Sequence, residues 1–341
     1  MVNMKFKDMK VGNNYEVTAL VIGMNELKDK NDSPFVQVIL SDGESIIPAL
    51  KFKTRIVDLE LAGIVEGSVV KAMVAVKTYN EETSYTVTTI KLASGEYAVE
   101  DFVVKAPTST KNDFTILMSI VKTSHTESVF DFDHAPISDL TIKLLRNNSE
   151  EFCFASAGQY MHHSEPGGLL EHTLSIVRAA ELMCNNHPEL DRELLICGAA
   201  LHDIGKIKEM STDMFGRTEY EPYGRLIGHS AIGINMVELE AENGDYDAER
   251  VQLLQHMIAS HHGSIHSGAI VAPAVPEAVV LHALDMADGA VYKFNEVYKT
   301  LPEGCLSEKK IPQLNNQYVY RAHPAYDETT VEMFTDWNEV W

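Results

Sequence analysis

The sequence predicts a two-domain protein in which a small all-β barrel precedes an all-α domain. Between residues 15 and 92, five stretches are rich in Val, Ile, Thr and Tyr, which favour β-strands. From about residue 113, apolar residues instead recur at the spacing of amphipathic or buried helices. The stretch between these patterns contains turn-forming residues. We therefore expect domains at residues 1–95 and 113–341, joined by a linker at residues 96–112.

The N-terminal strands are expected to close into a small barrel. Asp42-Gly43 is typical of a hairpin turn between the second and third strands. A short helix is expected after the third strand, from Thr54 to Leu61, with Thr54 as its N-cap. Five strands with a helix after the third are the pattern of an oligonucleotide-binding (OB) barrel. The expected strands span residues 15–24, 34–40, 45–52, 68–79 and 84–92.

Some side chains of this barrel suit single-stranded nucleic acid, because aromatic rings stack on bases and basic groups pair with phosphates. The candidate cations are Lys51, Lys53 and Arg55. The candidate rings are Phe35, Phe52, Tyr79 and Tyr85, of which we predict Phe35 and Phe52 to contact substrate. Packing within the barrel is the simpler explanation for any single ring.

The second domain is expected to be all-helical, with Gly and Pro separating the helices. No internal repeat interrupts this pattern. The expected helices span residues 114–123, 137–148, 169–186, 192–203, 229–243, 248–262 and 276–298.

The net charge of −22 is unevenly distributed. Residues 1–100 hold 11 Lys and Arg against 14 Asp and Glu, whereas the remaining residues hold 17 against 36. Such an acidic body argues against broad, nonspecific phosphate binding, although it also serves solubility. A polyanionic substrate would need local help from bound cations or a small basic groove.

Composition also bears on the cellular compartment. No uninterrupted apolar run is long enough for a membrane span, and the N-terminal residues do not resemble a signal peptide. Four scattered cysteines without a CxxC pair are typical of reduced thiols and make a cysteine-ligated zinc improbable. We expect a cytoplasmic protein that does not contact membranes.

The histidines of the helical domain gather at predicted helix ends, and two aspartates lie one turn apart on the last helix. The expected helix 192–203 ends in the adjacent residues His202 and Asp203, and Gly205 is expected to terminate it. The residues concerned are His172, His202, Asp203, His229, His261, His262, His282, Asp285 and Asp288. His256, in a helix interior, is assigned to packing.

Helix ends that converge on one point can build a metal site without breaking interior hydrogen bonds. Any one of these residues is more commonly a cap or a satisfied polar group. Together they favour a metal site, because burying so many unpaired polar groups would be costly. Imidazoles and carboxylates bind Mn, Fe, Co, Ni or Zn, and the carboxylates favour Mn(II). Asp203 can bridge two cations through its two oxygens.

Five segments in chain order carry a resemblance to a known family. They are HHSEPGGLLEHTLSIV (162–177), LHDIGKI (201–207), GRLIGHSAIG (224–233), LLQHMIASHHG (253–263) and EAVVLHALDMADG (277–289). The set resembles the HD superfamily of metal-dependent phosphohydrolases, and most closely its YhaM-type exoribonucleases. Those enzymes pair an N-terminal OB-fold domain with a C-terminal HD domain, which is the arrangement expected here.

The resemblance implies a role for each matched residue. One cation would be held by His172, His202, Asp203 and Asp285. Asp203 would bridge to a second cation, held by His229 and His261. Lys206 would meet the scissile phosphate, and His162, His163 and His262 would contact substrate, with His262 also a potential ligand. Asp288 is a weaker candidate ligand.

The function implied by the resemblance is 3′–5′ hydrolysis of single-stranded RNA to nucleoside monophosphates. The expected cofactors are two divalent cations, with Mn(II) favoured over Mg, Fe, Co, Ni and Zn. The expected partner is single-stranded nucleic acid, RNA in preference to DNA, with a homo-oligomer left open.

Two alternatives remain at this point. In the first, the chain is a different HD hydrolase that acts on free or cyclic nucleotides. In the second, it is a non-catalytic adaptor whose helical domain holds a structural metal. Dependence of the rate on substrate length separates the first alternative from an exonuclease, and strand binding without shortening would favour the second.

Overall fold

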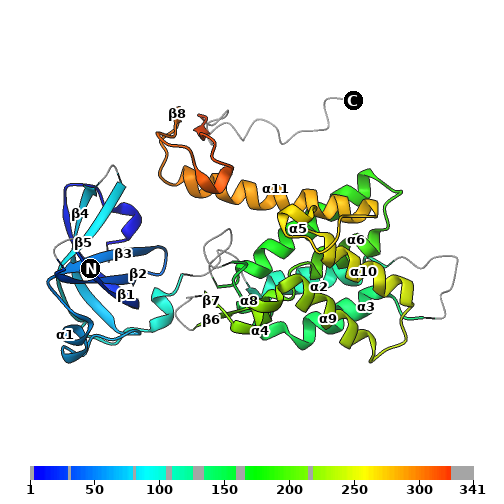
Figure 1. Cartoon of the computed structure of the whole chain (residues 1–341), viewed down its shortest axis with the longest axis horizontal. Helices are drawn as coiled ribbons and strands as arrows, with labels where there is room; N and C mark the ends of the chain where they lie inside the picture. The colour runs from blue at the N-terminus through cyan, green and yellow to red at the C-terminus, as the bar shows by residue number, and fades with distance from the viewer. Residues whose placement is uncertain are drawn as a thin grey trace, which may run out of the picture. The chain divides into compact units, whose positions relative to one another are not determined.

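The computed structural model describes residues 4–29, 32–79, 82–104, 110–125, 134–158, 166–213 and 218–323. The chain divides into two compact units, residues 1–282 and 283–341. The first unit begins with a five-stranded barrel and continues with a helical domain, so the predicted fold class is confirmed (Figure 1).

The barrel closes in the strand order β1-β2-β3-β5-β4. Its strands are β1 (Asn14–Lys28), β2 (Pro34–Ser41), β3 (Ile46–Phe52), β4 (Val69–Tyr79) and β5 (Glu82–Leu92). All pairs are antiparallel except β3 with β5, and α1 (Ile56–Leu61) lies between β3 and β4. Val36, Val38 and Leu40 point inward at alternate positions of β2 and are fully buried. This closed sheet with a helix after the third strand is the OB arrangement.

The start of α1 differs from the expected one. Thr54 does not cap the helix, because its hydroxyl donates to the carbonyl of Phe52 at 3.2 Å. The Asp58 carboxylate instead accepts the N–H of Arg55 at 2.8 Å, and the helix begins at Ile56. A carboxylate in the first turn satisfies an exposed helical N–H as well as a hydroxyl does.

The first part of the expected linker has structure of its own. A 3₁₀ helix, η2 (Val99–Phe102), follows the barrel. Phe102 and Val103 are buried against Leu20 of β1, and the Ser41 hydroxyl donates to the carbonyl of Phe102. The described part of this segment therefore packs on the barrel, and α2 begins at Thr110.

The helical domain contains the expected helices and three short ones. The helices are α2 (Thr110–Lys122), α3 (Ile137–Asn147), α4 (Ser149–Phe154), α5 (Gly168–Asn186), α6 (Arg192–Leu201), α7 (Lys206–Glu209), α8 (Pro222–Ile227), α9 (His229–Ala241), α10 (Ala248–Ser260) and α11 (Pro276–Tyr298). It is not strictly all-helical, since β6 (Met210–Thr212) pairs with β7 (Thr218–Tyr220), and β8 (Cys305–Leu306) pairs with β9 (Tyr320–Arg321). The remaining described 3₁₀ turns are η1 (Phe6–Asp8), η3 (Ile265–Ser267) and η4 (Pro312–Leu314).

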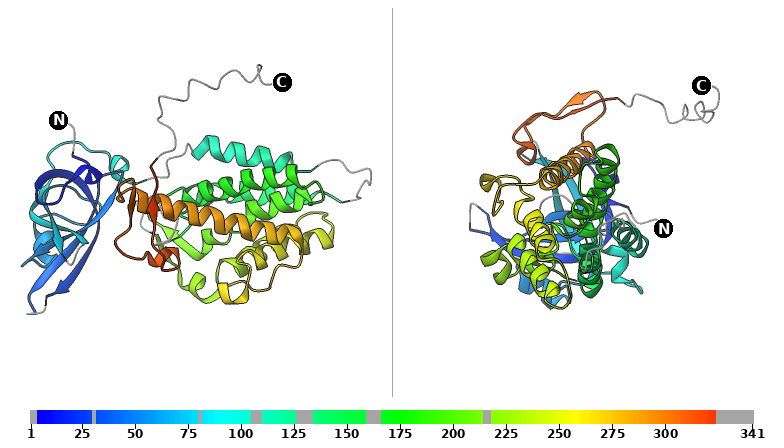
Figure 2. Two further views of the ribbon diagram at one scale, coloured as in Figure 1. Left: turned by 90° about the horizontal axis from the view of Figure 1, so that it is seen from above. Right: turned by 90° about the vertical axis from the view of Figure 1, so that its right-hand side faces the viewer.

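The α6 helix is central to the helical domain. Every residue from Glu193 to Leu201 is buried, and α6 packs against both α5 and α10. The green helices α5 and α6 and the yellow α10 lie side by side in the views of Figure 2. A helix that is apolar on all sides belongs in the interior. Whatever follows Leu201 is therefore placed deep in the domain.

The first turns of α6 and α10 are tied together. The Arg250 guanidinium, on α10, pairs with Asp191, the N-cap of α6, and with Glu193 at 3.1 Å. The two helices thus begin together, and their C-terminal ends also meet, with the rings of His202 and His261 5.3 Å apart.

Among the described helices, none combines the length and the apolar character that crossing a lipid bilayer requires.

Candidate metal centre

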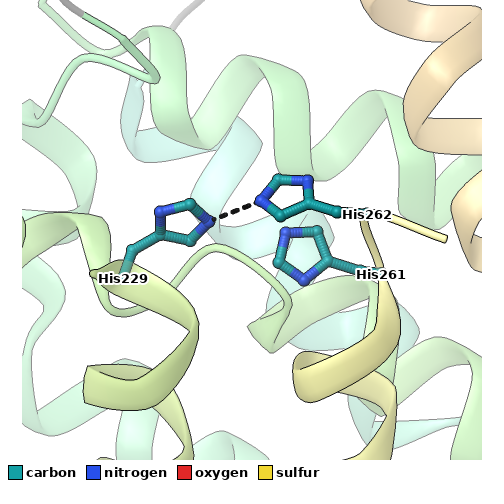
Figure 3. Close-up of side chains that lie close together, drawn as sticks. All are labelled: His229, His261 and His262. Carbon is teal, nitrogen blue, oxygen red and sulfur yellow. Dashed lines mark hydrogen bonds between the residues drawn. The ribbon is translucent and has the colours of Figure 1, made fainter. Parts of the chain in front are cut away.

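Five histidines and one aspartate converge where several helices begin or end. One potential ligand atom from each of His172, His202 and Asp203 lies within 4.8 Å of the other two, and the same holds for His229, His261 and His262. His172 lies on α5, His202 and Asp203 follow α6, His229 begins α9, and His261 and His262 follow α10. Figure 3 shows the second group, with His229 facing the two histidines at the end of α10.

Asp203 lies between the two groups and presents one oxygen to each. Its Oδ2 is 3.3 Å from His202 Nε2 and 3.7 Å from His172 Nε2. Its Oδ1 is 3.4 Å from His229 Nε2 and 3.7 Å from His261 Nε2. Asp203, His172, His202 and His261 are all at most 3% exposed, so the arrangement is screened from bulk water.

Hydrogen bonds to Nδ1 determine which ring nitrogens face Asp203 as acceptors. His202 Nδ1 lies 2.9 Å from the carbonyl of Ala199, and His261 Nδ1 lies 2.7 Å from the carbonyl of Ile258. A carbonyl only accepts, so both Nδ1 atoms carry a proton. In a neutral imidazole, Nε2 then carries a lone pair. His202 Nε2 faces Oδ2 of Asp203 and His261 Nε2 faces Oδ1. Both carboxylate oxygens also only accept hydrogen bonds, so each lone pair meets another acceptor.

This arrangement of acceptors fits bound cations. Among the described residues, Asp203 Oδ1 and His261 Nε2 are buried and make no hydrogen bond. Two ligands that each lie about 2.1 Å from one ion are roughly 3.0–3.4 Å apart, close to the separations observed around Asp203. Buried acceptors that face one another at such distances repel unless a cation lies between them.

The electrostatics of the centre favour its ligating forms. Burial raises the pKa of Asp203, but the positive charge of the adjacent Lys206 ammonium acts in the opposite direction, and that pKa is held well below its ordinary value. Burial holds the pKa of His261 well below its ordinary value, against the attraction of Asp203. The aspartate is therefore ionised and His261 is neutral, as metal binding requires.

Lys206 contacts the centre directly. Its Nζ lies 2.6 Å from Asp203 Oδ2, on the side of His172 and His202, and the side chain is 11% exposed. The first residue of α7 thus holds an ammonium group beside the central carboxylate, within reach of an anion that enters the centre.

Gly205 differs from its expected role. Its backbone is right-handed, with φ −62°, so it does not end the helix through a left-handed conformation. Instead it permits close packing: a Cβ at this position would lie 2.0 Å from the carbonyl oxygen of His229 and 2.8 Å from the nitrogen of Gly233. Gly205 therefore brings the turn after Asp203 against the first turn of α9, which carries His229.

Sequence reasoning missed Glu209. This buried carboxylate, at the end of α7, accepts both the backbone N–H and the Nδ1–H of His229. Burial raises the pKa of Glu209, but the hydrogen bonds from His229 outweigh it and lower the pKa below its ordinary value. An acid six residues after Asp203 in a lysine-containing helix looks like an ordinary surface residue, so the sequence carried no signal for it.

Residues 169–289 match the family model of the HD domain. The matched range contains every residue of the two groups around Asp203. This part of the chain is therefore an HD domain with two clusters of His and Asp that suit a binuclear metal site, as is typical of metal-dependent phosphohydrolases with this domain.

A solved structure was also found for the N-terminal part of the chain. It is the second OB-fold domain of replication protein A from Methanococcus maripaludis, at 16% identity and a TM-score of 0.23. The match covers 28% of this chain and 100% of that one. The assignment of the barrel rests on its own strand order.

Other predicted residues of the HD domain lie outside the two clusters. Asp285 and Asp288 are half-buried on α11, within the second compact unit, and their part in the centre stays a prediction. His162 and His163 lie outside the described residues. His256, assigned to packing, is half-buried, and its Nε2 accepts the N–H of Ala274 at 2.9 Å.

Phe35 and Phe52, predicted to contact substrate, face each other on β2 and β3. They are register partners with ring centroids 5.5 Å apart, and Phe52 is 47% exposed. Lys53 and Arg55 are exposed immediately after Phe52. Tyr85 instead packs against the barrel core, and the side chain of Tyr79 lies outside the described residues.

Proposed function

We propose that this protein is a metal-dependent 3′–5′ exoribonuclease of the YhaM type. It hydrolyses the phosphodiester bonds of single-stranded RNA, with DNA as a second substrate, and releases nucleoside monophosphates. The observation that carries the proposal is Asp203, whose two oxygens face two groups of histidines in an HD domain. The OB barrel on the same chain supports a strand rather than a free nucleotide as the substrate.

Each residue of the centre has a role in this proposal. Two divalent cations, with Mn(II) the best match to mixed imidazole and carboxylate donors, would supply an activated water and Lewis acidity toward a phosphoryl oxygen. His172, His202 and Asp285 would hold one cation, His229 and His261 the other, and Asp203 both. The remaining contacts with substrate are assigned to Lys206, His262, His162 and His163.

Lys206 is assigned to the scissile phosphate because of its position. Its ammonium is partly exposed and lies beside Asp203, so an anion that reaches the centre comes close to it. A positive charge placed where negative charge grows on the nonbridging oxygens lowers the barrier to hydrolysis. The cations and Lys206 together would also offset the repulsion between an acidic protein and its anionic substrate.

The barrel would hold the strand through the face that carries Phe35 and Phe52. The exposed Phe52 ring beside Lys53 and Arg55 combines stacking with phosphate pairing, which is the usual chemistry of single-strand binding. Strands β2 and β3 form the binding face of other OB barrels.

Replacing the exposed ring should weaken strand binding without unfolding the barrel. Phe52→Ala is expected to raise the Kd for a 20-nucleotide RNA by about 5-fold or more, since stacking on one base contributes roughly 1–3 kcal/mol. Fluorescence anisotropy in EDTA measures binding without turnover. The matched control is Val57→Ala, which truncates a side chain of similar exposure on α1. A Kd unchanged by Phe52→Ala would remove this face from the proposal.

The proposed activity is tested with single-stranded RNA and DNA labelled at the 5′ end and incubated with a panel of divalent cations. We expect a ladder that shortens progressively from the 3′ end, faster for RNA than for DNA, and fastest with Mn(II). A labelled mononucleotide that appears at once would contradict the 3′–5′ direction.

Substrate length separates the alternatives in the same experiment. Equal rates on free or cyclic mononucleotides and on oligomers would favour a nucleotide hydrolase. Binding without any shortening would favour an adaptor.

A cytoplasmic location belongs to the same proposal. All four cysteines are free, and Cys184 and Cys197 are buried. Burial raises the pKa of Cys197 to about 12, so this thiol stays protonated and unreactive. Unpaired, inert thiols are typical of proteins that work in a reducing compartment.

A further inference from the structure

Glu209 holds His229 at two points. Its Oε1 accepts the backbone N–H of His229 at 3.0 Å, while Oε1 and Oε2 lie 3.2 and 3.1 Å from His229 Nδ1. Glu209 is only 7% exposed. Glu209 therefore accepts a backbone N–H that has no partner within α9, and it also sets the orientation of the His229 imidazole.

This contact directs the other ring nitrogen of His229 toward Asp203. Because an ionised carboxylate only accepts, the proton lies on Nδ1, and in the neutral ring Nε2 becomes the acceptor. That Nε2 is 3.4 Å from Asp203 Oδ1 and 3.1 Å from His262 Nε2 (Figure 3). The contact with Glu209 thus prepares His229 as a ligand.

The position of Glu209 is itself fixed by the backbone. Its carbonyl accepts the N–H of Glu221, which precedes α8, at 3.0 Å. A Cβ on Gly224 would lie 2.1 Å from the same carbonyl oxygen, so only glycine allows α8 to pack this closely. Glu209 is therefore held between α7, α8 and α9 and is not a mobile surface acid.

The support of His229 differs in charge from that of two other histidines. His202 and His261 donate Nδ1–H to the neutral carbonyls of Ala199 and Ile258. His229 donates to a full negative charge. A carboxylate behind an imidazole makes the ring a stronger donor to a cation than a carbonyl does, and loss of such a partner typically lowers metal affinity by about 10- to 100-fold.

We propose that Glu209 is a positioning residue for the cation on the His229 side of Asp203, and that it makes the two cation positions unequal. This inference rests on the metal centre of the proposed function but not on the identity of the substrate. Loss of the Glu209 charge weakens the cation held by His229 and leaves the cation held by His172 and His202 nearly unaffected.

The test is a calorimetric titration of Mn(II) into the metal-free full-length protein and the Glu209→Gln variant. Gln keeps the shape and one acceptor but removes the charge. We expect two binding events in the wild type, and in Glu209→Gln a loss of about 10- to 100-fold in the affinity of one event only. Glu221→Gln, which removes an exposed charge from the neighbouring segment, is the matched control and should change neither event.

A second variant covers the case in which Glu209→Gln does not fold. Glu209→Asp keeps the charge but shortens the side chain, and should bind one cation with an affinity between those of wild type and Glu209→Gln. Equal weakening of both events, or of neither, in whichever variant folds would overturn the role of Glu209. A wild-type protein that binds no Mn(II) would instead overturn the metal centre itself, so the two failures are distinguishable.

Discussion

Asp203→Asn is expected to abolish tight binding of both cations and to lower the rate of phosphodiester hydrolysis by roughly 10³-fold or more. The amide keeps the size of the side chain but loses its charge. It also offers one acceptor oxygen in place of two. A bridging ligand needs both oxygens, because each faces a different group of histidines.

The loss should exceed that caused by removing any single histidine of the centre. His172 and His202 face one oxygen of Asp203 and His229 and His261 face the other, whereas Asp203 faces both groups. In the metal-free protein, the variant also removes the negative charge that pairs with the Lys206 ammonium at 2.6 Å. Both effects act on the centre and leave the buried apolar residues of α6 unchanged.

The measurements are Mn(II) content after dialysis, steady-state rate on labelled RNA, and circular dichroism as a check of fold. Asp245→Asn is the control, since that aspartate is exposed and pairs only with His134 among its described ion pairs. Activity within about 10-fold of wild type in Asp203→Asn would argue that the aspartate does not bridge two cations.

Gly205→Ala is expected to be the most disruptive small substitution near the centre. The added methyl group would lie 2.0 Å from the carbonyl oxygen of His229, and backbone atoms cannot rotate out of the way. We expect a loss of about 2–4 kcal/mol in the free energy of unfolding, because overpacking against a rigid backbone forces helices apart. The shift would fall on the first turn of α9 and displace His229.

Urea denaturation measures the stability of this variant, and Mn(II) titration measures the state of the centre. The control is Lys208→Ala, which truncates an exposed side chain on α7. It should change the free energy of unfolding by less than about 0.5 kcal/mol. Wild-type stability in Gly205→Ala would mean that the turn after Asp203 is not packed against α9.

Patterns that span many residues predicted most of the fold. Five stretches rich in β-forming residues predicted the barrel. Apolar residues recurring at helical spacing over many residues predicted α5, α9, α10 and α11. The short helices α4, α7 and α8 span 6, 4 and 6 residues, too few for a helical period to show. The 3₁₀ turn that carries Phe102 packs against Leu20 through a tertiary contact. Its sequence contains only turn-forming signals, so it was predicted to be part of the linker.

The histidines of the centre were found because they stand at helix ends beside glycine or aspartate, in an order that resembles a known superfamily. Glu209 and the packing role of Gly205 could not be found in this way. Both depend on how closely α7 approaches the start of α9, twenty or more residues later in the chain. Such approaches follow from tertiary packing, which no local pattern records.

The central claim is that Asp203 lies between two cations. Anomalous diffraction from crystals grown with Mn(II) tests it most directly. The account predicts two peaks roughly 3.5–4 Å apart, one next to each oxygen of Asp203, with His202 on one side and His229 on the other. A single peak away from Asp203, or none at saturating Mn(II), would contradict it.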